Sequence, residues 1–262
     1  MKIVAINGSH RGDKGFTHFL INKVATGATQ EGASFETIDL SKHKINRCIG
    51  CQMCHTEKSF LKCIYEGEDD VKEIFDKIRR ADTLIFATPI YLFNMSGLLK
   101  VFLDRINSTG DSGKLQMSKS GLFFHHIDHE LCSKPFVLLV CCDNMEDETP
   151  KNVISYFRTY SKFMDAPMVG TIVRKSGKLI GHGQSPEKER RYPKIYDVYD
   201  ALQQAGRDLA IIGKIHSKTQ NRTNQHIIDI PPMLNILMKF RPFKKRALEK
   251  AKRMFTDGGP LA

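Results

Sequence analysis

Short, almost wholly apolar runs recur along this chain and alternate with segments of helical period. Three of them are KIVAI at 2–6, TLIFAT at 83–88 and FVLLVCC at 136–142. A strand without polar alternation is typical of a parallel sheet covered on both faces. Two further strands are predicted at 34–40 and 168–174. Apolar residues at helical spacing predict the intervening helices over 16–29, 71–78, 97–106, 153–163 and 195–212.

This order of strands and helices predicts an α/β fold, a doubly wound five-stranded parallel sheet with right-handed crossovers and helices on both faces. We expect one domain over 1–216. It contains a polar, histidine-bearing insertion at 110–134, whose position suggests a lid over a ligand. The residues from 217 to 262 form a basic C-terminal extension.

The overall charge favours anionic partners without choosing among them. The 262-residue chain has a formal net charge of +11, and much of the excess lies late in the sequence. The segment 231–255 mixes apolar and basic residues, interrupted by Pro242. It is a candidate for contact with a membrane surface, but we favour a helix that packs onto its own domain or onto a sister subunit. We assign no nucleic-acid partner.

The chain opens directly on an expected strand, without the features of a secretory leader, so we expect a cytoplasmic protein. Its seven cysteines are then expected to stay reduced.

The first expected strand is followed by a glycine-bearing turn and then a helix. Backbone N–H groups in such a turn converge on an anion. Ser9 and Thr17 add hydroxyl groups, Arg11 or Lys14 adds charge, and Gly15 lies just before the helix. The spacing matches neither the Walker pattern nor G-x-G-x-x-G. A single terminal phosphate, as in FMN, therefore fits this loop best.

A second loop, at 88–97, follows the third expected strand and would lie beside the first. Pro89 and Ile90 leave the strand, and Tyr91 offers a flat face or a hydroxyl. Hydrogen bonds to a polar ring edge would come from Asn94 and from the backbone N–H groups of Met95, Ser96 and Gly97. An isoalloxazine ring needs this mixture of contacts.

With these motifs, the sequence resembles the NAD(P)H-dependent FMN reductase family of flavodoxin-like proteins. The matching pieces are Gly8-Ser9-x-Arg11 after a strand, Ala81-Asp82, Thr88-Pro89-Ile90-Tyr91, Ser96-Gly97-Leu98-Leu99-Lys100 and Asp104-Arg105. They cover roughly the first 106 residues.

The resemblance implies that Ser9, Arg11 and Thr17 hold the FMN phosphate. It also implies a ribityl and ring pocket lined by Pro89, Tyr91, Asn94, Met95, Ser96 and Gly97, and an oligomer, a dimer or tetramer. His10 and Phe16 depart from the residues common in the family. The third loop, from Cys141 to Met145, lacks the family's glycines.

Four cysteines follow the second expected strand with the spacing Cys48-x2-Cys51-x2-Cys54-x8-Cys63. Such a run is a recurring way to hold a [4Fe–4S] cluster, and the iron–sulfur flavoprotein branch of the same family has the cysteines in this order. Structural zinc is an alternative, and free cysteines without a metal are another.

The other cysteines and the histidines have simpler interpretations. Cys132, Cys141 and Cys142 are expected in the core, where cysteine behaves as a small hydrophobe. His125, His126 and His129 are interpreted as a polar loop and not as a metal site.

The leading hypothesis is an FMN-dependent oxidoreductase that moves electrons between NAD(P)H or a ferredoxin and an unknown acceptor through a cluster. No side chain is assigned as a catalytic acid, base or nucleophile. Two alternatives stay open: a NAD(P)H:quinone or flavin reductase without a cluster, and a non-enzymatic electron carrier.

Overall fold

The computed structural model describes residues 1–180, 186, 190, 192–227 and 240–256. The chain divides into two compact units, Met1–Gln225 and His226–Ala262, and each is described by itself.

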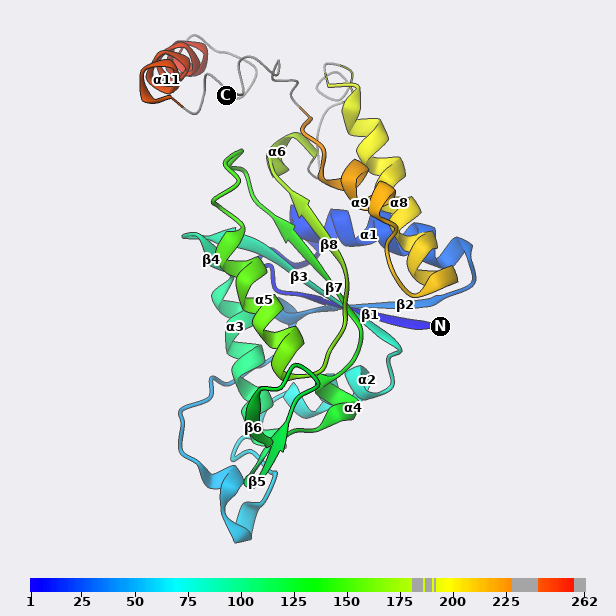
Figure 1. Cartoon of the computed structure of the whole chain (residues 1–262), viewed down its shortest axis with the longest axis vertical. Helices are drawn as coiled ribbons and strands as arrows, with labels where there is room; N and C mark the ends of the chain where they lie inside the picture. Colours follow the sequence, from blue (N-terminus) through cyan, green and yellow to red (C-terminus); the bar gives the residue numbers. More distant parts are fainter. Residues whose placement is uncertain (181–185, 187–189, 191, 228–239, 257–262) are drawn as a thin grey trace. The chain divides into compact units, whose positions relative to one another are not determined.

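The first unit is built on a twisted parallel sheet (Figure 1). Its strands lie in the order β2-β1-β3-β7-β8, and neighbouring strands pair in parallel. This is the flavodoxin-like order, in which the connections reverse direction beside β1. The bounds are β1 Lys2–Asn7, β2 Ser34–Asp39, β3 Thr83–Tyr91, β7 Phe136–Cys141 and β8 Met168–Arg174. The predicted flavodoxin-like fold is confirmed.

The sheet has six strands and not the predicted five. The added strand is β4 (Asn94–Met95), which pairs antiparallel with the end of β3. Leu92 and Phe93 turn the chain between them with positive φ angles of 45° and 65°. The loop expected at 88–97 is therefore partly a hairpin, which the sequence did not indicate because neither Leu92 nor Phe93 is a typical turn former. A two-residue hairpin results, and Tyr91 ends a strand.

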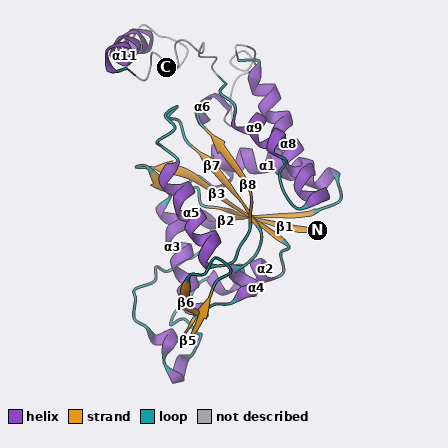
Figure 2. Ribbon diagram, in the orientation of Figure 1, coloured by secondary structure: helices purple, strands orange, loops and turns teal. Residues whose placement is uncertain are grey.

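Alternate residues of the central strands face different helices. Val4, Ile6, Leu84 and Phe86 belong to the core cluster that also contains buried side chains of α2, α3 and α5, whereas the equally buried Ile85 does not. Successive side chains of a strand point to opposite faces of the sheet. Because helices cover both faces, these runs are apolar throughout. Helices and strands are coloured separately in Figure 2. The helix bounds are α1 Phe16–Gln30, α2 Val71–Arg79, α3 Gly97–Asp104, α5 Lys151–Phe163 and α8 Lys194–Ile212.

Helices α1 and α8 pack closely against each other. A Cβ atom on Gly27 would lie 1.8 Å from the Gln203 carbonyl oxygen, and one on Gly206 would lie 1.9 Å from the Val24 carbonyl oxygen. Only glycine at both positions permits this backbone approach.

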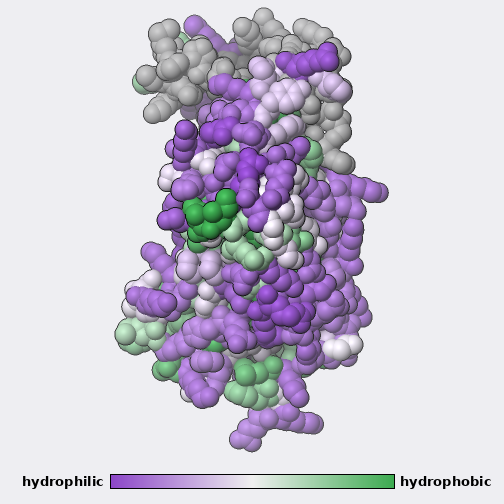
Figure 3. All heavy atoms as spheres, turned by 90° about the vertical axis from the view of Figure 1, so that its right-hand side faces the viewer, coloured by the Kyte–Doolittle hydropathy of each residue, from purple (hydrophilic) through white to green (hydrophobic). Residues whose placement is uncertain are grey.

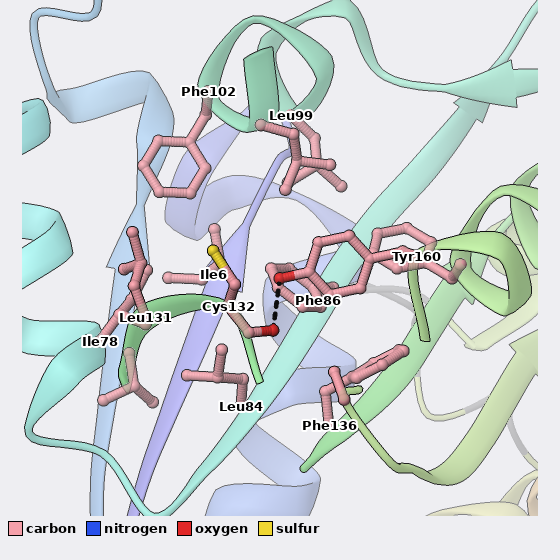
Figure 4. Packing of buried hydrophobic residues seen from close by; sticks show 14 of the residues in the cluster. Ile6, Ile78, Leu84, Phe86, Leu99, Phe102, Leu131, Cys132, Phe136 and Tyr160 are labelled. Carbon is pink, nitrogen blue, oxygen red and sulfur yellow. Dashed lines mark hydrogen bonds between the residues drawn. The ribbon is translucent and has the colours of Figure 1, made fainter. Parts of the chain in front are cut away.

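The core beneath β3 and β7 is aromatic. Phe86, Phe136, Phe157 and Tyr160 contact one another with ring centroids 5.1–6.1 Å apart. The Tyr160 hydroxyl donates a 3.0 Å hydrogen bond to the Cys132 carbonyl oxygen (Figure 4). The three cysteines predicted for the core, Cys132, Cys141 and Cys142, are all buried.

The insertion at 110–134 is structured. It forms a hairpin of β5 (Asp111–Met117) and β6 (Phe123–His126), followed by the short helix α4 (His129–Cys132). The hairpin lies near the cysteine loop, at the opposite end of the sheet from β4 (Figure 1). Residues 110–134 therefore do not form a lid over the carboxyl ends of the strands.

Helix α9 (Ser217–Asn224) protects the free edge of β8. Side-chain oxygens of Gln220 and Asn224 accept hydrogen bonds from the N–H groups of Thr171 and Val173, at 2.6 and 2.8 Å. These bonds replace the partner strand that an edge strand lacks. The compact unit accordingly continues to Gln225. Figure 3 shows one face of the molecule, which is mainly hydrophilic with small, separate hydrophobic groups.

In the second unit, helix α11 runs from Arg241 to Thr256. Pro242 lies in its first turn and does not interrupt it, which is the position where proline suits a helix. Residues 228–239 of the basic and apolar segment lie outside the described residues. None of the described helices combines the length and the hydropathy needed to span a bilayer.

Candidate cofactor site and cysteine loop

The carboxyl ends of β1 and β3 are neighbours in the sheet and carry the two loops singled out by sequence. From β1 the chain continues to β2, which lies on one side of the β1–β3 pair. From β3 it continues to β7, which lies on the other side of that pair. In doubly wound sheets ligands bind at this switch point. The structure therefore brings the 8–17 loop and the β3–β4 turn together where a ligand site is expected.

The first loop is fixed by a buried polar network. The Asn7 amide nitrogen donates to an Asp39 carboxylate oxygen at 2.7 Å, and the Asn7 amide oxygen accepts from the Ser9 N–H at 3.1 Å. The Ser9 hydroxyl oxygen accepts from the Arg11 N–H at 3.2 Å. Asn7 and Ser9 are almost fully buried. These internal hydrogen bonds hold the loop in one conformation.

Helix α1 begins at this loop without a capping side chain. Its N-cap is Gly15, which has no side chain to bond the first backbone N–H groups. Thr17 is buried in the first turn, and the exposed Arg11 lies with its guanidinium 5.3 Å from the Phe16 ring centre. Free N–H groups and the helix dipole favour an anion here.

Ser96 joins the second loop to the first. Its hydroxyl donates to the Gly8 carbonyl oxygen at 2.6 Å and accepts from the Leu99 N–H at 3.2 Å, so it also caps α3. Its own N–H donates to the Thr88 hydroxyl at 3.0 Å. A Cβ on Gly8 would lie 2.7 Å from the Leu99 Cβ, so only glycine allows this approach.

The residues of the second loop divide into inward and outward groups. Ser96 and Met95 are buried, and the Met95 N–H is bonded to the Asn94 amide oxygen at 2.8 Å. Tyr91, Asn94 and Gly97 are exposed, while Pro89 and Ile90 are half-buried. Tyr91 stacks on His10 of the first loop, with centroids 6.1 Å apart. The N–H groups of Met95 and Ser96 are therefore already paired within the protein.

The cysteine loop gathers its four thiols around one small cavity. Cys48, Cys51, Cys54 and Cys63 all border this cavity, together with Arg105. Cys48 and Cys51 are exposed, and Cys54 is buried. Burial raises the pKa of the Cys54 thiol, and the negative charge of the other three thiolates raises it further.

Arg105 presents a buried positive charge to this cavity. It lies at the end of α3, at the start of a 3₁₀ turn (Arg105–Thr109), and is 2% exposed. It donates to the Asp69 carboxylate and, at 2.8 Å, to the Asn46 carbonyl oxygen. Its Nε has no hydrogen-bond partner among the described residues.

The residues of the loop fit a tetrathiolate-bound group in number, chemistry and charge. Four thiolates are the usual ligands of an iron–sulfur cluster or of structural zinc, and Arg105 would offset part of their negative charge. Within the described residues, however, no three Cys, His, Asp or Glu side chains are close enough to bind a single metal ion. Metal binding therefore requires the thiols to move closer together.

Several residues that support both sites were not found from the sequence. Asp69 lies just before the helix predicted at 71–78, and its carboxylate pairs with Arg105. Asn7 and Asp39, which end β1 and β2, were not singled out. The sequence feature that could have identified them is a polar residue at the end of a strand.

Other residues lie where they have no part in either site. His125 and His126 are on strand β6 and not in a loop, and His129 begins α4. The third loop follows β7, and burial raises the pKa of Cys141 to about 12 and that of Cys142 to about 11.

The sheet order and the two loops at its switch point define a flavodoxin-like α/β protein. Residues 1–128, just under half of the chain, match the family described as NADPH-dependent FMN reductase.

The chain is also similar to iron–sulfur flavoproteins. One from Methanocaldococcus jannaschii is 38% identical over 105 residues, covering 40% of this chain and 51% of the relative. Another, from Archaeoglobus fulgidus, is 34% identical over 105 residues, covering 40% and 48%. The chain thus matches about half the length of these relatives.

A solved structure supports the fold over a longer range. An FMN-dependent NADH-azoreductase from Bacillus anthracis, in complex with FMN, has a TM-score of 0.55 and 14% identity, covering 80% of this chain and all of that one.

Proposed function

We propose that this protein is an FMN-dependent oxidoreductase that takes electrons from NAD(P)H or a ferredoxin and carries a [4Fe–4S] cluster in its cysteine loop. The observation that carries the proposal is the joining of the two strand-end loops at the switch point through Ser96 and Gly8. The names of the relatives support the FMN and iron–sulfur parts of it.

FMN would supply the hydride and electron chemistry. The backbone N–H groups at the start of α1 would bind its phosphate, with Ser9, Thr17 and Arg11 beside them. Tyr91 would lie along the ring, and Asn94 and Gly97 would bond its polar edge. Gly15 keeps the helix start open, and Pro89, Ile90, Met95 and Ser96 hold the turn in place.

In the cysteine loop, Cys48, Cys51, Cys54 and Cys63 would be the cluster ligands. Arg105 would offset their negative charge from a buried position. Helix α3 has eight residues, so about 12 Å of helix separates Ser96 at one site from Arg105 at the other. One rigid element therefore links the two sites.

We also propose a homo-oligomer, with the cysteine loop at or near a subunit contact. This loop exposes large apolar side chains, among them Ile49, Phe60 and Leu61, which are 41–54% accessible. A group of this kind marks an interaction surface.

The decisive experiment is purification without oxygen, followed by an absorption spectrum with iron and acid-labile sulfide assays. Bound flavin with about four irons per chain is expected. Flavin without iron would favour the NAD(P)H:quinone or flavin reductase. A protein that binds no added FMN would contradict the proposal. Saturable NAD(P)H oxidation would separate an enzyme from a carrier.

A further inference from the structure

A second cavity lies beside the cysteine loop, and the function proposed above assigns it no ligand. Its volume is about 470 Å³, within the range of small-molecule sites. It is bordered by the end of α3, the β6 strand and α5. Cys48 and Gly50 border both this cavity and the one that gathers the four thiols.

The walls of this cavity are mainly apolar and aromatic. Leu103, Ile106, Ile127 and Met164 supply aliphatic surface, and Tyr160 adds a ring whose hydroxyl is already bonded to Cys132. Such walls suit a flat apolar body and gain free energy by excluding water from it.

Three polar side chains border the cavity with unused hydrogen-bonding capacity. Asn107, His125 and Tyr156 make no side-chain hydrogen bond within the described part of the chain. The His125 ring packs against Gly110, where a Cβ would lie 2.7 Å from its Nε2. Burial raises the pKa of Tyr156 to about 12, so its hydroxyl remains a donor.

The residues of the described chain that border the cavity offer no cation to an anionic ligand. Asp104 is the one charged side chain among them, and its carboxylate is paired with Lys100 on α3. A carboxylate or phosphate would therefore lose its hydration here without gaining a countercharge from the cavity wall.

We propose that this cavity binds an uncharged, planar aromatic compound bearing a carbonyl group, with the carbonyl oxygen accepting a hydrogen bond from His125 or Tyr156. Binding stands independently of the proposed function. Only an effect of the bound ligand on the cluster rests on the proposed function, since a ligand here would lie beside the loop that would hold the cluster.

The test compares two uncharged probes that differ in one group, 2-acetylnaphthalene and 2-ethylnaphthalene, by calorimetric titration of the purified full chain. The acetyl compound is expected to bind roughly three- to tenfold more tightly, the usual effect of one neutral hydrogen bond. The carboxylate 2-naphthoate is expected to bind more weakly than either.

Each cavity variant has a matched control. His125→Ala and Tyr156→Phe are expected to remove the advantage of the acetyl probe. His126→Ala and Tyr196→Phe should keep it, because adjacent strand residues face opposite sides and Tyr196 lies on α8. Unchanged thermal unfolding, or rescue by His125→Gln, separates a lost contact from a lost fold.

Two results would overturn the proposal: no binding of either probe, or equal behaviour of His125→Ala and His126→Ala, which would place the probe elsewhere, such as over a flavin. Probe binding by a protein without flavin or iron would support this inference while contradicting the proposed function. A protein that contains flavin and iron but binds neither probe would contradict this inference and support the proposed function.

Discussion

Arg105 and Asp69 form an ion pair in which the two side chains are only 2% and 1% exposed. The pair joins the end of α3 to the segment before α2. Asp69 also accepts hydrogen bonds from the N–H groups of Asn46, at 3.0 Å, and of Val71, at 3.3 Å. One carboxylate thus ties both ends of the cysteine loop to the core.

Removing one partner of this pair is expected to destabilise the protein strongly. Arg105→Met leaves Asp69 buried without its countercharge, which typically costs about 3–5 kcal/mol. The free energy of unfolding, measured in urea, checks this value. The double variant Arg105→Met/Asp69→Asn should recover part of the loss.

The matched control is an exposed pair. Lys72 and Asp76 lie one helical turn apart on α2, and their side chains are 59% and 34% exposed. Lys72→Met should change stability by less than about 1 kcal/mol. Equal effects of the Arg105 and Lys72 substitutions would contradict the importance of burial.

A second prediction concerns the phosphate end of the proposed flavin site. Thr17 is buried in the first turn of α1, and Thr26 is exposed on the same helix. Thr17→Val should weaken FMN binding by roughly 10- to 100-fold, the loss of one hydrogen bond to a charged group. Quenching of flavin fluorescence measures this affinity. Thr26→Val should bind FMN like the wild type, and equal affinities of both variants would remove Thr17 from the site.

The sheet and its main helices could be predicted because apolar runs of this kind have few other solutions. The β3–β4 hairpin could not, since Leu92 and Phe93 occupy positive φ values that a sequence pattern does not assign to such residues. Pairing between Ile90 and Met95 holds the turn.

The residues that support the candidate sites could not be predicted from the sequence, for a related reason. The ion pair of Arg105 with Asp69 joins residues 36 positions apart, and no local periodicity marks it. The same holds for Asn7 with Asp39, which meet only because β1 and β2 are adjacent. Motif spacing indicates candidate ligands, whereas the residues that orient them depend on tertiary contacts.

A third prediction follows from the buried thiols. Burial raises the pKa of Cys132 and of Cys141 to about 12, from 9.0 for a free thiol. Because the folded state favours the protonated thiol, this contribution to stability is complete below pH 9 and is lost as the pH rises from 9 towards 12. The free energy of unfolding should fall over this range. It should fall less in Cys132→Ala/Cys141→Ala, and equal slopes would contradict the assignment.

The same burial predicts selective alkylation. The thiolate is the reactive form, and access to it is also required. In metal-free protein at pH 8, iodoacetamide should modify Cys48 and Cys51 at the surface and leave Cys132 and Cys141 unmodified. Peptide mass spectrometry identifies the modified residues. Early modification of Cys132 would mean that the α4 region opens readily.

A further prediction concerns the exposed apolar side chains of the cysteine loop. If this surface is a subunit contact, Phe60→Lys should dissociate the oligomer, because an unpaired charge would then have to be buried in the contact. Ile211→Lys is the control, since Ile211 is 65% exposed on α8, away from the cysteine loop. Light scattering during gel filtration gives the mass. An unchanged mass for Phe60→Lys would remove this surface from the contact.

The last prediction tests the four loop cysteines one at a time. Each of Cys48→Ser, Cys51→Ser, Cys54→Ser and Cys63→Ser should lower the iron content from about four per chain to well below one, because a cluster of this type needs four thiolates. FMN should remain bound, since its proposed site lies at the other end of α3. Cys132→Ala is the control, because Cys132 is buried in the core away from the loop and should leave the iron unchanged. Iron retained in Cys63→Ser alone would mean that another group is the fourth ligand. Zinc in place of iron in wild-type protein purified without oxygen would assign the loop a structural role and leave electron transfer to the flavin.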